Sequence, residues 1–305
     1  MAADTFTEVT TQGLFGRIGD SIKGVLVGLV LVVVGAGLLF WNEGRAVKTA
    51  KDLAAGAKSV IHIENNAVVS ANESKLVHLT ATAATTQHLE DKQFGISPKE
   101  NVLKLRRDVQ MYQWKETEKT EKEKNLGGSE TTRKTYTYSK TWSDKLIDST
   151  SFKQPGDHAN PQTMKFSSQT PVASPINTGA FVLAPELTAK INNFEPLPVA
   201  QPEPTPAGPE KPAGDATAAL PSNLKVADGG YYLGADPSSP QIGDTKIMFS
   251  VVKSGPVSAI GRQVGNQIGS FIGDNGTDLA MLQIGTVSAA DMFKAAEAAN
   301  RMLTW

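Results

Sequence analysis

The residues of this chain best suited to acid–base or metal chemistry are four scattered histidines: His62, His78, His88 and His158. No two of them share a helical i, i+4 spacing, and none is accompanied by a ligand pattern typical of zinc. The chain contains no cysteine, which excludes disulfides, thiolate ligands and cysteine nucleophiles. We therefore predict no metal site and no cofactor.

The most chemical-looking group is Asp157-His158, followed by Asn160-Pro161. An aspartate can orient an imidazole that acts as a general base. However, adjacent residues in a strand or turn point in different directions, and Asn-Pro is an ordinary loop signal. We therefore predict no catalytic residue and no enzyme activity. The alternative is a membrane-anchored hydrolase or a ligand-binding sensor, with its site in the β domain near His158.

Two glycine-rich motifs suggest sites only superficially. The segment GDNGTD at residues 273–278 lacks the alternating ligands and the final glutamate of a calcium loop, so a β-turn is expected. The segment GRQVGNQIG at residues 261–269 spaces its glycines by four, but it is too polar for a membrane dimer motif.

The segment that would anchor the chain in a membrane is the apolar segment from Ile22 to Trp41. From Val25 onward it has no charge and no proline, and its length suits a transmembrane helix. A signal peptide is the less suitable alternative, because WNEGRAV offers no small-residue cleavage site. A buried core helix is the other alternative. We predict a polar tail at 1–21, a transmembrane helix at 22–41 and an amphipathic stalk helix at 42–62.

The sequence after the stalk helix predicts an α+β fold, with a mixed, mainly antiparallel β domain over residues 63–287. Alternating residues predict strands at 75–83, 102–114, 131–147 and several ranges after residue 229. The charged segment after Trp114, with a turn at Gly127-Gly128, predicts a protruding hairpin. A short helix is expected at 185–194 and a disordered proline-rich insert at about 198–222. Ser288 and Asp291 resemble a capping box, which predicts a C-terminal helix at 288–305.

Charge limits the possible partners. The 305 residues carry a formal net charge of -1, which argues against binding to nucleic acid. Charges beside the apolar segment favour a cytosolic C-terminal domain by only one positive residue. Long domains cross membranes largely regardless of such a difference, so charge alone leaves the orientation open.

A family resemblance lies in three stretches that follow in order: LLFWNEGRAVKTAKDLAAG, VLKLRRDVQMYQWKETE, and DHANPQTM with IGDTKIMFS downstream. In order and spacing they resemble the transmembrane protein 43 family, also called LUMA, over nearly the whole chain. The proline-rich insert at 202–221 departs from the family pattern, as does the lack of further spans after Trp305. The alanine-rich composition is more similar to a bacterial relative, truncated before the C-terminal spans.

That resemblance implies an N-terminal span, a large lumenal or periplasmic domain and a scaffold role for membrane protein complexes. In animals the family lies in the endoplasmic reticulum and inner nuclear membrane, with lamins and emerin as associates. For this chain we therefore expect three kinds of partner: the lipid bilayer, membrane proteins and further copies of itself. If the chain is bacterial, it is expected in the inner membrane.

Overall fold

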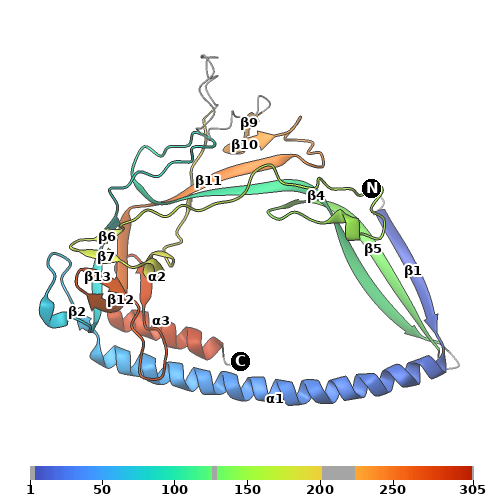
Figure 1. Ribbon diagram of the computed structural model, residues 1–305, viewed down its shortest axis with the longest axis horizontal. Helices are drawn as coiled ribbons and strands as arrows, with labels where there is room; N and C mark the ends of the chain where they lie inside the picture. Colours follow the sequence, from blue (N-terminus) through green and yellow to red (C-terminus); the bar gives the residue numbers. More distant parts are fainter. Residues whose placement is uncertain (1–3, 126–128, 201–223, 304–305) are drawn as a thin grey trace.

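In the computed structural model the chain forms a closed hoop, with one long helix along one side and β-sheets along the others (Figure 1). The structure describes residues 4–125, 129–200 and 224–303, without the side chains of residues 14–24. Helix α1 (Leu14–Ser59) has 46 residues and contains no proline, so nothing in its sequence interrupts the backbone hydrogen bonds. At 1.5 Å per residue it is about 69 Å long.

The first sheet extends from the domain to the far end of α1. Its strand order is β1-β5-β4-β11-β10-β9, with β8 also paired to β11, and its pairs are antiparallel. β-Branched and aromatic residues recur along these strands, which suits a pleated surface. The bounds are β1 Asp4–Gln12, β4 Val102–Lys124, β5 Glu130–Ser143, β8 Glu195–Pro196, β9 Leu224–Ala227, β10 Gly230–Leu233 and β11 Thr245–Lys253.

The second sheet lies at the other end of α1. Its order is β14-β12-β13-β7-β6-β3-β2, and β12 also pairs with β3. Its pairs are antiparallel except β13–β7 and β2–β3, which are parallel. The bounds are β2 Ile61–His62, β3 Leu76–Ala84, β6 Asn177–Thr178, β7 Phe181–Leu183, β12 Gly255–Val264, β13 Gln267–Gly269 and β14 Met281–Ile284.

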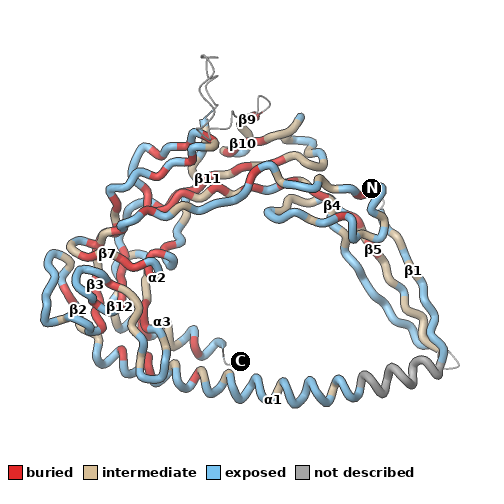
Figure 2. Tube along the Cα trace, in the orientation of Figure 1, coloured by how far each residue is buried: buried red, intermediate tan, exposed pale blue. Residues whose placement is uncertain are grey.

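Both sheets contribute side chains to one main hydrophobic core, which includes Leu79, Leu105, Ile247 and Val257. Short helices occupy the connections: η1 Ser70–Asn72, η2 Ser149–Ser151 and α2 Pro185–Thr188. Helix α3 (Ala289–Met302) lies alongside the C-terminal part of α1 (Figure 1). Leu53, Leu279, Met292 and Phe293 form a second core cluster at this junction (Figure 2).

The structure confirms the α+β class and most of the predicted elements. The alternating segments become β3, β4, β5, β10, β11, β12 and β14, and the charged residues after Trp114 extend β4 to Lys124 as one arm of a hairpin. The Ser288 side chain caps α3, because its Oγ accepts a hydrogen bond from Asp291 N at 3.2 Å. The expected turn at Gly127-Gly128 lies outside the described residues.

Four expectations differ from the structure. The polar tail is replaced by β1 and the start of α1, because the Thr-rich segment at 4–12 finds a pairing edge on β5, which the local sequence does not reveal. The stalk ends at Ser59, and Ile61–His62 joins β3 as a strand. Helix α2 ends at Thr188 rather than at residue 194. Backbone hydrogen bonds order Leu197 and Val199, so the insert begins later than expected, and its residues 201–222 lie outside the described part.

Candidate functional site

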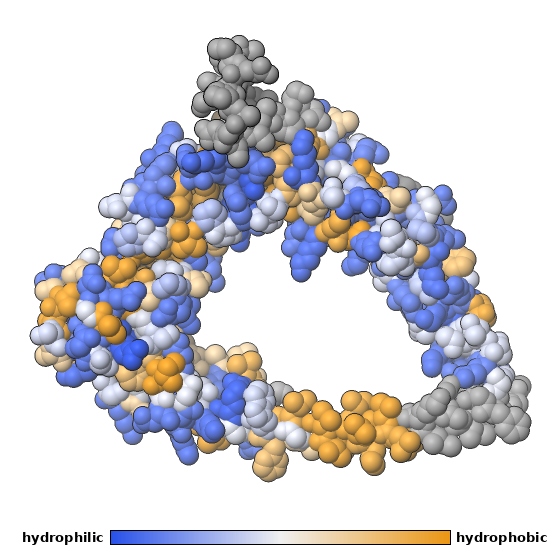
Figure 3. All heavy atoms as spheres, viewed as in Figure 1, coloured by the Kyte–Doolittle hydropathy of each residue, from blue (hydrophilic) through white to orange (hydrophobic). Residues whose placement is uncertain are grey.

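The apolar part of α1 forms one side of the hoop, and most of its residues are exposed (Figure 2). Among the described residues, α1 is the one helix whose length and composition suit a membrane crossing. Val30 is 58% exposed and Phe40 is 83% exposed. Figure 3 shows this apolar band along one side of the hoop, around an opening that side chains leave unfilled. An exposed apolar surface of this length is typical of a helix that lipid covers.

A polar clamp fixes the C-terminal half of α1 to the domain. The buried Asp52 carboxylate accepts hydrogen bonds from the Asn275 backbone at 3.0 Å, the Asn275 side chain at 2.8 Å and Thr277 N at 3.0 Å. The loop that donates them is the predicted turn, since Gly276 N donates to Gly273 O. The GDNGTD motif therefore holds α1, and its amide groups bind a carboxylate of the same chain.

Close packing and a second hydrogen bond reinforce this junction. A Cβ added to Gly56 would lie 2.7 Å from Leu279 Cδ1 and 3.0 Å from Phe293 Cε1, so only glycine fits here without movement. The buried Asn300 of α3 donates to Ala46 O at 2.9 Å. The helix and the β domain therefore move together. Sequence reasoning missed Asp52 and Gly56, because their partners are more than 200 positions away.

His158, the residue of the alternative enzyme hypothesis, is buried beneath the start of β1. Its Nδ1 lies 2.9 Å from Gln154 O and its Nε2 lies 2.8 Å from Asp4 Oδ2. Both neighbours are acceptors, so both contacts are hydrogen bonds only when the ring is doubly protonated. The ring stacks on Tyr138 at 3.7 Å and meets Trp114 edge to face at 4.7 Å. Acceptors of the same chain lie beside both nitrogens and two aromatic rings contact the imidazole, which describes a structural clasp.

Tyr138 links this clasp to the hairpin. Its hydroxyl donates to Glu116 Oε2 at 2.7 Å and accepts from Gln154 N at 3.1 Å. Burial and the bond to Glu116 raise the pKa of Tyr138 to about 12, so the hydroxyl stays protonated at physiological pH. The nearby Asn160 binds both Trp114 N and Trp114 O through its side chain, at 2.7 and 2.9 Å. The Asn-Pro segment thus fixes a loop to β4.

The structure brings together two of the histidines that look scattered in the sequence. β2 and β3 pair in parallel with His62 opposite His78, and the two Nδ1 atoms lie 2.9 Å apart. His78 Nε2 lies 3.0 Å from Val287 O. His88 instead contacts Ser97 and Asn101 in an exposed loop. In the part of the chain that the structure describes, no group of three or more His, Cys, Asp or Glu could hold a metal ion.

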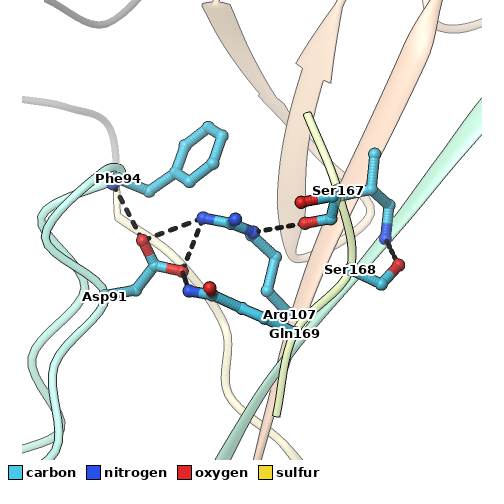
Figure 4. A network of polar contacts seen from close by, with 7 residues as sticks. Asp91, Phe94, Arg107, Ser167, Ser168 and Gln169 are labelled. Carbon is cyan, nitrogen blue, oxygen red and sulfur yellow. Dashed lines mark hydrogen bonds and ion pairs between the residues drawn. The ribbon is translucent and has the colours of Figure 1, made fainter. Parts of the chain in front are cut away.

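A buried ion pair lies in the main core (Figure 4). Arg107 Nη1 donates to Asp91 Oδ2 at 2.8 Å and to Oδ1 at 3.1 Å, and both side chains are at most 4% exposed. Gln169 Nε2 and Phe94 N also donate hydrogen bonds to the Asp91 carboxylate. Arg107 Nε donates to Ser167 O. Every one of these groups is satisfied, so the pair joins β4 to two loops. Arg107 stands in the RRDVQMYQW stretch, whose sequence gives no sign of its partner.

Two pockets of moderate size open on the surface. One of 420 Å³ lies beside α1 at the end of the apolar run and includes Trp41, Arg45 and Lys48 among its walls. The other, of 390 Å³, is lined by residues 146–150 and 160–162 and does not include His158. The first therefore combines aromatic and cationic groups at the boundary between lipid and water.

Comparison with known proteins gives one consistent family. The family model described as "Transmembrane protein 43" matches residues 111–305. Transmembrane protein 43 of Rattus norvegicus is 32% identical over 304 residues, covering 96% of this chain and 72% of the relative. The Homo sapiens protein is 31% identical over 304 residues with the same coverage. The Drosophila melanogaster homolog is 31% identical over 286 residues, covering 92% and 71%. No solved structure matches the chain.

Proposed function

Because this chain belongs to the transmembrane protein 43 family, we propose that it is an integral membrane scaffold that holds membrane protein complexes through its large β domain. The observation that carries the proposal is the β4–β5 hairpin, which projects from a domain clamped to a membrane helix (Figure 1). Eight of the ten residues from 115 to 124 are charged, and both signs alternate closely. Such a surface suits polar contacts with the extramembrane parts of other proteins.

The proposed role is non-catalytic. Both ring nitrogens of His158 face acceptors of the same chain, so no described contact of this residue favours the hydrolase or sensor alternative. We propose that the domain lies on the lumenal side of an endoplasmic reticulum or nuclear membrane, or on the periplasmic side of a bacterial inner membrane. The support is the family membership. The flanking charges favour the opposite side by only one positive residue, and long domains cross membranes largely regardless of such a difference.

The scaffold proposal is tested in cells that lack the endogenous protein. Membrane complexes are extracted in mild detergent and resolved by native electrophoresis with mass spectrometry. We expect complexes that disappear without the chain and return with the unaltered chain. They should fail to return when Lys119→Glu and Lys122→Glu reverse two exposed charges of the hairpin. Lys92→Glu together with Lys99→Glu, an equal change of charge in a distant exposed loop, is the matched control.

Two results would count against a scaffold. One is a complex profile that is unchanged when the chain is removed. The other is a profile that both hairpin and control variants restore equally, because the hairpin would then carry no partner. Retention of the hairpin variant in carbonate-washed membranes shows that its failure does not arise from lost anchoring.

A further inference from the structure

The 420 Å³ pocket beside α1 stands where the apolar run meets the domain. One wall is α1 from Phe40 to Thr49 and the other is the loop of Asn275, Gly276 and Thr277. Phe40 and Trp41 are 83% and 68% exposed on the lipid side of this pocket. Aromatic residues favour the headgroup level of a bilayer, so a transmembrane α1 places the pocket at that level.

The pocket carries two cations. The guanidinium of Arg45 is half-buried and is oriented by Asn42, whose Oδ1 accepts from Nη2 at 2.9 Å. Lys48 is exposed one turn further along the same helix. Asp52, one turn beyond Lys48 on α1, already accepts hydrogen bonds from the loop, and Glu43 is not among the residues that line the pocket. Thr49 and Thr277 add two hydroxyl groups, 3.5 Å apart.

Two glycines line open space in the pocket. A Cβ at Gly44 or at Gly276 would meet no atom within 4 Å, so each glycine borders free space. Gly276 also has φ +89°, a left-handed conformation that suits glycine. We propose that this pocket binds the headgroup of an anionic phospholipid, with Arg45 and Lys48 on the phosphate. Arg pairs with phosphate through two parallel hydrogen bonds, and Lys acts as a point charge.

The test is native mass spectrometry of the full chain released from nanodiscs that contain equal parts phosphatidylglycerol and phosphatidylcholine. We expect one phosphatidylglycerol retained in preference to phosphatidylcholine. Arg45→Gln or Lys48→Gln should each weaken this retention about fivefold, the effect of one cation near an anionic surface. Gly44→Leu should abolish it while leaving every charge in place.

Lys51→Gln removes an equal charge from the same helix outside the pocket and should leave retention unchanged. Equal losses in Lys51→Gln and Lys48→Gln would overturn the site, because they would indicate diffuse attraction. Equal retention of both lipids would overturn it as well. Displacement of the lipid by an equimolar amount of inorganic phosphate would also overturn the site, since the pocket would then recognise free phosphate.

A separate relationship concerns β1, which closes the hoop by pairing with β5 from Asp4↔Tyr138 to Gln12↔Glu130. None of its nine residues is buried. Its side chains make the clasp to His158, an ion pair between Glu8 and Lys153 at 3.2 Å, and a ring contact between Phe6 and Tyr136. Asp4 is 55% exposed in the first contact, and Lys153 and Glu8 are 44% and 36% exposed in the second. Ion pairs with such exposed partners stabilise a strand only weakly.

This closure is incompatible with a planar bilayer across the apolar run. The run is joined at its C-terminal end to the domain and at its N-terminal end to β1, which leads back along the hairpin to the same domain (Figure 1). A bilayer crossing the run would therefore also cut the hairpin. Charged strands with an open edge do not lie in hydrocarbon.

We infer that β1 is a releasable strap, paired with β5 when α1 is outside a bilayer and detached when α1 crosses one. The uncharged run of 17 residues from Val25 to Trp41 gains far more from lipid than β1 gains from a half-exposed edge. Detachment leaves β5 from Glu130 to Tyr138 as a free edge on the domain side of the membrane.

Because the chain has no cysteine, introduced thiols report the strap directly. Thr7→Cys with Thr135→Cys places two thiols on paired positions of β1 and β5. Oxidation should link them in the soluble fraction of a vesicle-free synthesis and at least tenfold less in chain inserted into vesicles. Thr120→Cys with Lys134→Cys, paired within the hairpin, should link equally in both preparations.

Single thiols at Thr7 and Ser129 should react with an impermeant maleimide from opposite sides of the vesicle. Equal linking of β1 to β5 with and without vesicles would overturn the strap, and would place α1 along one membrane surface. Labelling of both single thiols from the same side would also overturn the strap, because α1 would then not cross the membrane. Absence of the link in both preparations, with the hairpin control linked, would overturn the closed form.

Discussion

His62 and His78 face each other across two parallel strands with their Nδ1 atoms 2.9 Å apart, while His78 Nε2 lies 3.0 Å from Val287 O. If His78 uses its Nε2–H for Val287, its Nδ1 must accept the proton of His62. The pair then shares one hydrogen between two rings. A second proton on His78 Nδ1 would place two N–H groups face to face.

The pH dependence of stability follows from this pair. Burial lowers the pKa of His78, the hydrogen bond to Val287 opposes the shift, and the charge of His62 adds to it. The unfolded chain, with a histidine pKa of about 6.5, therefore takes up this proton more readily than the folded chain. The contribution of neutral His78 to the free energy of unfolding is therefore complete above about pH 6.5 and is lost as the pH falls below that value. Melting temperatures of His78→Gln should decline less between pH 7 and pH 5 than those of the unaltered chain, and His88→Gln should follow the unaltered chain.

The buried pair of Arg107 and Asp91 makes a double-mutant prediction. Asp91→Leu leaves a buried guanidinium without its carboxylate, and Arg107→Met leaves a buried carboxylate without its guanidinium. Each single variant should lower the free energy of unfolding by about 3–5 kcal/mol. The double variant Asp91→Leu/Arg107→Met should recover most of that loss. Urea unfolding measures all three. Additive losses in the double variant would show that the two residues act independently.

The apolar run predicts sensitivity to a single charge. Val30→Asp places a carboxylate near the centre of the run and should cost about 2.5–3.5 kcal/mol of insertion free energy. Carbonate extraction of expressing cells should find the unaltered chain in the membrane pellet and a larger soluble fraction of the variant. Val68→Asp, at an exposed position of the domain, is the control. A fully soluble unaltered chain would contradict the transmembrane assignment.

The contact of Gly56 with Leu279 and Phe293 predicts how firmly α1 is held. Gly56→Leu overpacks the junction and should lower the free energy of unfolding by about 1–3 kcal/mol. Gly44→Ala lies on the same helix in open space, where higher helix propensity should stabilise by up to about 1 kcal/mol. Thermal unfolding followed by circular dichroism compares the two. Equal effects would indicate that α1 does not pack here.

The sequence predicts those features that depend on local pattern. Uncharged residues define the apolar run, alternation defines β3, β4 and β11, and Ser288 marks the start of α3. Features that join distant segments leave no local trace. Asp52 resembles any polar helix residue until the loop 225 positions later donates to it. Residues 4–12 resemble a tail because their partner strand begins only at residue 130.

One consequence of the uninterrupted α1 is mechanical. The helix passes from the apolar run into the Asp52 clamp without a proline or a break, so it acts as a lever with the bilayer as its pivot. Membrane helices tilt by about 20° on average, and the angle changes with bilayer thickness. The 18 residues from Asn42 to Ser59 extend about 27 Å, so a 20° tilt displaces their far end sideways by about 9 Å. A change in the tilt of the apolar run would therefore move the clamped β domain with the helix.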